Sequence, residues 1–203
     1  ASGESGVIKV SSYEQLQGLA LASTAGVKLN NIELINDIDL SGKSWQPFGF
    51  DKEHPFEGTI DGKEHTIKGL GPNGYISTAI IVNTTNKNEG FAYGFVSVAK
   101  NATIKNVNFT DVNINIENGI AIGAVVGDAR GNSLKIENVT VSGAVKGKDK
   151  VGGLVGLAGY YESSDFQLTI TNCTNNASVT AVCTNNYNRA GGIVGALGGD
   201  AIF

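Results

Sequence analysis

The amino-acid sequence predicts an all-β fold, a right-handed parallel β-helix with an α-helix that caps its N-terminal end. Two short elements alternate along the chain, one rich in Gly and the other centred on Asn. Copies of one element follow each other within the period of roughly 20–50 residues that is typical of solenoids, propellers and arrays. Because the copies contain short β-rich runs without helical periodicity, we expect each repeat to be one coil stacked on the preceding coil.

The Gly-rich element is complete at residues 151–156, recurs with variation at 122–127 and 190–195, and is degenerate at 94–97. Its small residue before a large apolar one stands at positions 94, 124, 153 and 192, giving gaps of 124−94=30, 153−124=29 and 192−153=39. The Asn copies are separated by 138−106=32 and 172−138=34 residues. The repeat positions are Gly94, Gly123, Gly127, Gly152, Gly153, Gly156, Gly191, Gly192, Gly195, Asn106, Asn138 and Asn172.

Both residue types suit the corners of stacked coils. Gly adopts positive φ and allows close backbone approach, Asn is the next best resident of the left-handed region, and stacked Asn side chains can form amide ladders. Read as a strand, the Gly-rich element places Gly153 on one face with Val155, and Leu154 on the other face. Because both Leu154 and Val155 are apolar, either face could be the inner one, and Gly153 is expected to be crowded in both cases.

Residues 11–24 are expected to form the capping helix. A capping box fits at Ser12 with Gln15, or one residue earlier, and an apolar stripe at helical spacing begins at Leu16. Gly26 is a suitable C-terminal cap. A solenoid end has unpaired strand edges, so a helix placed before the first coil would act as its lid. The first strand is expected at 32–40.

The ordered set of Asp37 to Leu40, Trp45, the Gly-Thr-Ile-Asp-Gly run at 58–62 and the later Gly and Asn copies resembles the GLUG-motif repeat proteins of bacterial surfaces. The resemblance covers about residues 7–195. It implies a secreted or cell-surface β-helix, often adhesin-like or found beside peptidase domains. We expect one domain over 1–203, with first coils at 30–70 and GLUG-type repeats at 91–195, as a segment of a larger surface protein. The degenerate copy at Gly94 and the Ala at 124 depart from the motif.

Composition narrows the functional classes. The 203 residues have a net charge of −4, so nothing favours binding to nucleic acid or anionic lipid, and no apolar run is long enough to span a membrane. The start at Ala1, without Met, indicates a processed or cloned mature form. Two Cys do not make a disulfide framework, and Cys173 occupies a position where other copies have Val. We expect a monomer.

No catalytic residue, metal site or cofactor is predicted. Asp37 and Asp39 would share one face of a strand and could bind a metal or serve a glycosidase, but bonds to turn amides of the next coil are the preferred interpretation. Trp45 is interpreted as a packed corner rather than a sugar platform. The histidines, His54 and His65, lie in no peptidase motif.

Binding is predicted on Tyr160 and Tyr161, adjacent in a polar loop, with Tyr187 from a neighbouring loop. Three functions follow in order of preference: a non-catalytic, adhesin-like module that binds host or dietary glycan or protein; a structural spacer; and a carbohydrate-active enzyme. Converging carboxylates in a cleft would favour the enzyme, and exposed aromatic side chains would favour binding. The absence of both features would favour the spacer.

Overall fold

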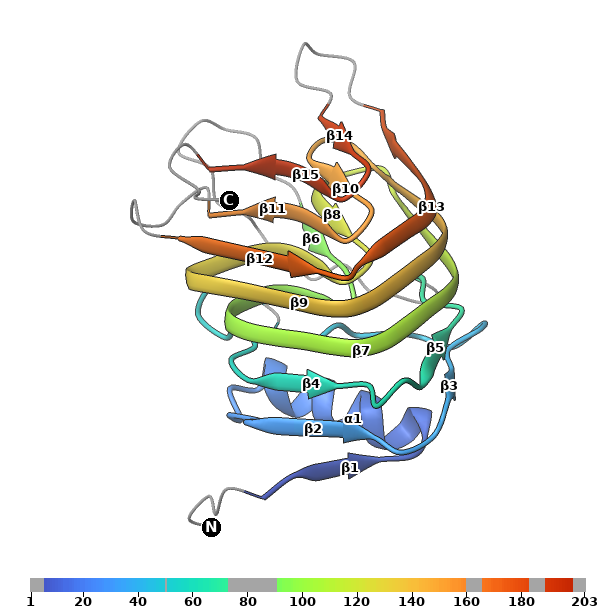
Figure 1. Cartoon of the computed structure of the whole chain (residues 1–203), viewed down its shortest axis with the longest axis vertical. Coiled ribbons are helices and arrows are strands. Elements are labelled where there is room, and N and C mark those ends of the chain that lie inside the picture. The colour runs from blue at the N-terminus through green and yellow to red at the C-terminus, as the bar shows by residue number, and fades with distance from the viewer. Residues whose placement is uncertain (1–5, 50, 73–90, 160–165, 183–188, 199–203) are drawn as a thin grey trace.

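The computed structural model describes residues 6–49, 51–72, 91–159, 166–182 and 189–198. These residues form a parallel β-solenoid of about four turns with a single short helix near the N-terminus, which confirms the predicted fold class (Figure 1). The elements in chain order are β1 Ile8–Val10, α1 Tyr13–Thr24, β2 Asn31–Leu34, β3 Ile38–Asp39, β4 Thr59–Asp61, β5 Thr66–Lys68, β6 Phe91–Tyr93, β7 Val96–Ile116, β8 Gly119–Gly123, β9 Val126–Gly147, β10 Val151–Gly152, β11 Val155–Ala158, β12 Gln167–Thr171, β13 Thr174–Ala181, β14 Ala190–Gly191 and β15 Val194–Leu197.

Successive coils add one strand at a time to two parallel sheets. The larger sheet contains the order β1-β2-β4-β7-β9, with β12 and β13 paired to β9, and the smaller one has the order β14-β10-β8-β6. In Figure 1 the levels rise from β1 at the bottom to β13 and β14 at the top. The strands β7 and β9 bend around a corner and remain paired along most of their length. Each coil therefore buries its apolar side chains against the next coil.

The Asn copies form a continuous ladder at one corner. Asn106, Asn138 and Asn172 have φ of 52°, 53° and 53°, the left-handed conformation that Asn tolerates better than other non-Gly residues. The Asn138 side-chain amide donates to Oδ1 of Asn106 at 2.8 Å, and that of Asn172 donates to Oδ1 of Asn138 at 3.2 Å. The ladder begins on Asp61, whose carboxylate accepts from the Asn106 amide at 3.0 Å. The spacing of the copies thus places their side chains one above another.

The Gly-rich element is a corner between the two sheets, and not the continuous strand on which two alternating faces were predicted. β10 ends at Gly152 in the smaller sheet and β11 begins at Val155 in the larger sheet. Leu154 and Val155 are both completely buried, because the bend between the strands turns both side chains inward. The choice between two alternating faces, one inner and one outer, therefore does not apply to this element.

Glycine is required in this corner for close approach, not for a left-handed backbone, since none of the repeat glycines has positive φ. A Cβ added at Gly153 would lie 2.2 Å from the Gly192 carbonyl oxygen of the next coil. Three equivalent glycines of successive coils are crowded by backbone atoms near the smaller sheet. An added Cβ would lie within 2.6 Å of the backbone in each case, at Gly127 against Tyr93, at Gly156 against Ile122 and at Gly195 against Lys150.

The first Gly copy is one residue shorter than the others. Tyr93 pairs with Ile122 before the corner and Val96 pairs with Val126 after it, so two residues stand where the second copy has three. Phe95 is completely buried in this shortened corner and stacks on Trp45 at 5.2 Å between ring centroids. The degenerate copy thus serves the aromatic part of the core.

Helix α1 begins and ends close to the predicted bounds but belongs to the first turn. Ser12 is its N-cap, accepting from the Gln15 backbone at 3.4 Å, and Gly26 follows its end with φ of 84°. Strand β1 precedes the helix and pairs with β2, so the first strand is at residues 8–10, not at 32–40, and the helix does not stand before the first coil. Leu16, on the inner side of α1, is completely buried at the N-terminal end of the core.

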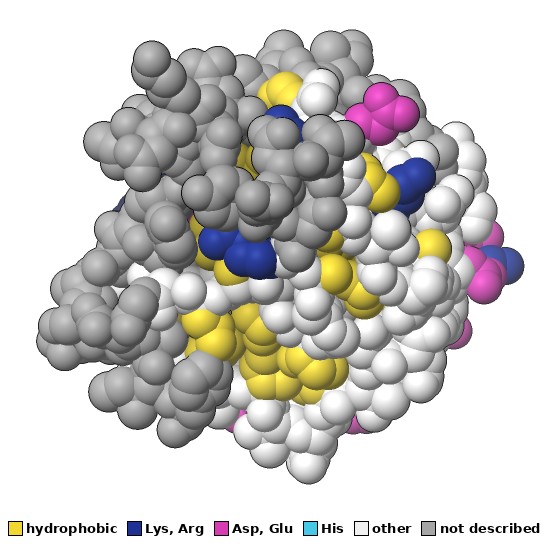
Figure 2. Space-filling model, turned by 90° about the horizontal axis from the view of Figure 1, so that it is seen from above, with side chains coloured by type: hydrophobic (Ala, Val, Ile, Leu, Met, Phe, Trp, Pro, Cys, Tyr) yellow, Lys and Arg dark blue, Asp and Glu magenta, His cyan; other side chains and the backbone are white. Residues whose placement is uncertain are grey.

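The two ends of the stack differ in burial. Leu134 and Ile136 of β9 are completely buried, whereas their partners Leu168 and Ile170 of β12 are only partly buried. Cys173, predicted as a small buried residue, is likewise half-buried. Figure 2 views the molecule from above and shows hydrophobic side chains at the surface of this upper end. Among the described residues, no helix is long and apolar enough to cross a membrane.

Candidate functional site

A pocket of about 330 Å³ lies between the C-terminal end of α1 and the segment at 51–57, with one residue of β7 at its edge. This volume is at the lower end of the range of roughly 300–1,000 Å³ that small-molecule sites occupy. Its lining combines charged and apolar side chains with backbone. The lining residues are Ser23, Gly26, Val27, Lys28, Leu29, Lys52, Glu53, His54, Pro55, Phe56, Glu57 and Lys100.

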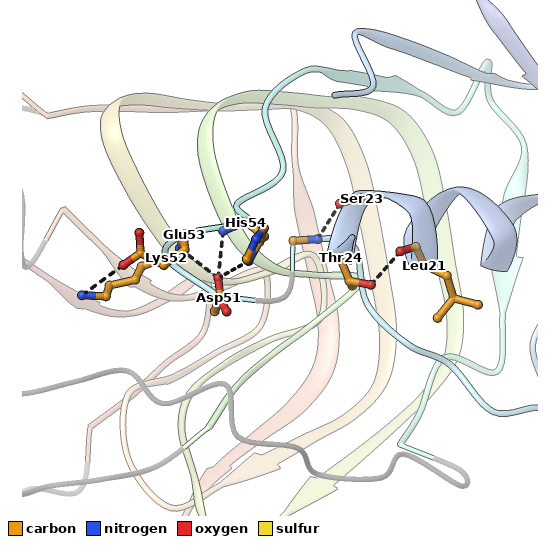
Figure 3. Close-up of polar contacts among 8 residues, drawn as sticks. Leu21, Ser23, Thr24, Asp51, Lys52, Glu53 and His54 are labelled. Carbon is orange, nitrogen blue, oxygen red and sulfur yellow. Dashed lines mark hydrogen bonds and ion pairs between the residues drawn. The ribbon is translucent and has the colours of Figure 1, made fainter. Parts of the chain in front are cut away.

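Asp51 organises the loop that forms one wall. Its Oδ1 accepts from the backbone N–H groups of Glu53 and His54, both at 2.8 Å, and lies 3.1 Å from His54 Nδ1 (Figure 3). A carboxylate that bonds to amides two and three residues ahead is the usual Asp-initiated turn. The His54 ring is thereby directed towards Gly26, where an added Cβ would lie 3.4 Å from the ring.

The end of α1 forms the opposite wall. The backbone N–H groups of Ala25, Gly26 and Val27 donate to the carbonyl groups of the last helical turn, which leaves that turn well capped. Ser23, buried on the inner side of the helix, accepts from the Gly49 backbone N–H at 3.0 Å (Figure 3). The helix end is therefore tied to the chain that enters the 51–57 loop.

Three charged side chains from three successive coils meet at the pocket. Lys28 Nζ lies 3.2 Å from Glu57 Oε2, and Lys100 Nζ lies 3.4 Å from Glu57 Oε1. Partial burial alone would raise the pKa of Glu57, but the hydrogen bonds and charges of Lys28 and Lys100 outweigh it and lower the pKa. Glu57 is thus ionised at neutral pH, and holds two ammonium groups beside the pocket.

The charges of the lining add to a positive value. Three lysines and two glutamates line the pocket, and these five side chains sum to +3−2=+1. The whole chain has a net charge of −4. The Asp51 carboxylate in the wall behind His54 offsets the charge of the lining, so the excess of positive charge is confined to the side of the pocket where Lys28 and Lys100 meet Glu57.

The residues predicted for binding, Tyr160, Tyr161 and Tyr187, lie outside the described residues. In the described part of the chain, Trp45, Tyr93 and every described Phe except the partly buried Phe91 are buried. Trp45 is completely buried, as expected for a packed corner and not for a sugar platform.

The paired carboxylates of the second coil have structural partners. Asp37 Oδ1 accepts from the Thr66 backbone N–H of the next coil at 2.8 Å and lies 3.2 Å from His65 Nδ1, as the turn-amide interpretation predicted. Asp39 instead accepts from Ser41 of its own turn at 2.8 Å. Within the described ranges, no group of three or more His, Cys, Asp or Glu could hold a metal ion.

Sequence reasoning did not find the Lys28–Glu57–Lys100 cluster, although the register contains it. Strands β2, β4 and β7 pair through Asn31, Thr59 and Thr103. The three charged residues precede these positions by 31−28=3, 59−57=2 and 103−100=3 residues. Once the coils are aligned on these strands, the alternation of charge at one place on the surface becomes visible.

Comparisons with known proteins agree with the fold. No family model matches the chain. Halomucin from Haloquadratum walsbyi is 30% identical over 157 residues, which covers 73% of this chain and 2% of halomucin. The crystal structure of a putative immunoglobulin A1 protease from Bacteroides ovatus superposes with a TM-score of 0.58 and 18% identity. That match covers 98% of this chain and 64% of the other, so the chain spans less than two thirds of either protein, and the second likeness shows the fold alone.

Proposed function

We propose that this chain is a non-catalytic structural module of a secreted or cell-surface protein, which uses a stiff stack of coils to hold other parts of that protein at a distance. The ladder from Asp61 through Asn172 is the main support, because its side-chain hydrogen bonds join successive coils at one corner. Each coil is bonded only to its neighbours, as in other quasi-one-dimensional repeat proteins. Such a stack resists bending over its whole length.

The location outside the cell is supported by two resemblances. One is to the ordered motifs of GLUG-type surface proteins, and the other is to a segment of halomucin. The match to 2% of halomucin fits a module that is small relative to the protein containing it. The adhesin-like role assigned to Tyr160, Tyr161 and Tyr187 remains a prediction.

The non-catalytic part of the proposal is supported by how the best-placed carboxylates are engaged. Asp61 accepts from Asn106 and lies 3.5 Å from both Lys63 and Lys105. Glu57 is held between two lysines, and Asp149 is held by Lys150 and Arg189. A glycosidase needs two carboxyl groups that converge on one bond. These carboxylates instead each hold cationic side chains of the protein itself.

Two measurements on the purified chain test the proposal. Small-angle X-ray scattering at two temperatures below unfolding should fit one rigid solenoid, and a broad distribution of sizes would contradict the stiffness. Incubation with a panel of polysaccharides and with immunoglobulin A should give no cleavage. Cleavage that is lost in Asp61→Asn or Glu57→Gln would overturn the non-catalytic assignment.

A further inference from the structure

We infer that the pocket beside α1 binds a carboxylate-bearing sugar residue of a glycan, of the hexuronate type. This inference goes beyond the structural role proposed above and does not depend on it. It rests on the arrangement of charge in the pocket, on its mixed lining and on its size.

The ammonium groups of Lys28 and Lys100 provide the anion-binding element. Glu57 neutralises one of their two charges and leaves the Lys28–Glu57–Lys100 cluster with a charge of +1. An ammonium group has three N–H donors. In the described contacts each lysine uses one donor towards Glu57, so both retain donors for a ligand carboxylate. The Lys28 side chain is 80% exposed and the Lys100 side chain 47%, so a ligand can reach both.

The rest of the lining favours a sugar over a simple anion. The carboxylates of Glu53 and Glu57 accept hydrogen bonds, as ligand hydroxyl groups require. The exposed Val27 and the partly buried Pro55 contribute apolar surface that the C–H face of a pyranose ring can cover. A pocket of about 330 Å³ lies within the range of roughly 300–1,000 Å³ that small-molecule sites occupy. An acidic sugar presents an anionic group, hydroxyl groups and an apolar face, and the pocket has a complement for each.

The C-terminal end of α1 has a partial negative charge that would weakly oppose an anion at an exposed site. Here the last carbonyl groups already accept hydrogen bonds from residues 25–27, so they are not turned as free acceptors towards the pocket. The Lys28–Glu57–Lys100 cluster, with a net charge of +1, therefore outweighs this partial charge where the ligand carboxylate would bind.

Titration followed by ¹⁵N NMR tests the inference on the intact chain of 21.0 kDa. The probes are sodium glucuronate, glucose and sodium acetate at equal ionic strength. Glucuronate should give saturable shifts of the amides of Gly26, Leu29 and Glu57, and glucose and acetate should bind much more weakly. An equal response to acetate would mean an adventitious anion only, and an equal response to glucose would mean a neutral-sugar site; either would overturn the inference.

Matched charge variants locate the site. Lys28→Gln/Lys100→Gln should weaken glucuronate binding about tenfold, which corresponds to about 1.4 kcal/mol, because two exposed charge pairs with the ligand carboxylate are lost. The control Lys9→Gln/Lys135→Gln removes the same charge from β1 and β9 and should leave binding unchanged. Equal weakening in both pairs, or no saturable shift in the parent, would overturn the inference without affecting the structural role. Thermal midpoints of the variants verify the fold.

Discussion

Replacing Gly153 by Ala, with Gly192→Ala as the matched control, separates coil stacking from every other effect of a Gly substitution. The two glycines follow the paired residues Gly152 and Gly191, so they occupy the same place in successive coils, and neither has positive φ. The two positions differ in whether another coil lies against them. A Cβ at Gly153 would lie 2.2 Å from the Gly192 carbonyl oxygen and 2.3 Å from Asn175 Nδ2, whereas a Cβ at Gly192 meets no described atom within 4 Å.

The magnitude follows from three contributions. Overpacking at Gly153 destabilises by roughly 1–3 kcal/mol. The new methyl group also disturbs the hydrogen bond from Asn175 Nδ2 to the Gly192 carbonyl at 2.7 Å, which contributes about 0.5–1.5 kcal/mol. Reduced entropy of the unfolded chain offsets about 0.4–1 kcal/mol of this loss. We expect a net loss of about 2 kcal/mol for Gly153→Ala, and a gain of up to about 1 kcal/mol for Gly192→Ala.

Thermal unfolding followed by far-UV circular dichroism measures the difference. For a chain of this size, 1 kcal/mol shifts the midpoint by roughly 2–4 °C, so Gly153→Ala should lower it by about 4–8 °C and Gly192→Ala should leave it equal or higher. Equal midpoints for Gly153→Ala and the parent would refute the crowding argument. Equal losses in both variants would show that the glycines are needed for something other than approach of the next coil.

Three further substitutions test the ladder, a buried ion cluster and the aromatic core. In urea unfolding, Asn138→Ala should lower the free energy of unfolding by about 1–2 kcal/mol more than Asn138→Gly. Both variants lose the hydrogen bonds of the ladder, but only Ala is strained at a φ of 53°. Equal losses in the two variants would contradict this. Burial alone would raise the pKa of Asp149, but hydrogen bonds and charges from Arg189 and Lys150 outweigh it and lower the pKa. The folded pKa is below the unfolded one, so the ionised group stabilises the fold above about pH 4 and this contribution is lost as pH falls through the folded pKa. Asp149→Asn should therefore unfold before the parent at pH 7, with a gap that narrows below about pH 4; a constant gap would exclude the ion cluster as the cause. Trp45→Ala should destabilise by about 3–5 kcal/mol in thermal unfolding, and a loss under 1 kcal/mol would show that the ring does not support the core.

The period of the repeats was sufficient to predict the stacking, because one coil has nearly the same length as the next and register then follows. The cap at Ser12 and the end at Gly26 were predictable for a similar reason, since both depend on residues within one turn of the helix. The corner at Gly153 was not. Alternation of side chains applies to extended backbone, and the sequence does not show that the chain bends between Gly152 and Val155.

The pocket was also beyond sequence reasoning based on motifs. Lys28, Glu57 and Lys100 are far apart in the chain, and each is an ordinary surface residue in its local sequence. They meet because the coils place equivalent positions one above another, and this became visible only when the strands were aligned through their pairing. Unequal spacing also hid the alignment, since the paired positions are 59−31=28 and 103−59=44 residues apart.

The Asn ladder has a consequence for how the length of such a protein can change during evolution. An in-frame duplication or loss of the 138−106=32 residues between Asn106 and Asn138 would leave every rung bonded to a rung of the same kind. Loss of one residue can be absorbed at a corner, as in the short first Gly copy, whereas loss within a paired strand would shift the following side chains relative to the coil beneath. Recombination between repeats is therefore tolerated in whole coils, and the number of coils can vary among relatives while the N-terminal turn with α1 stays single.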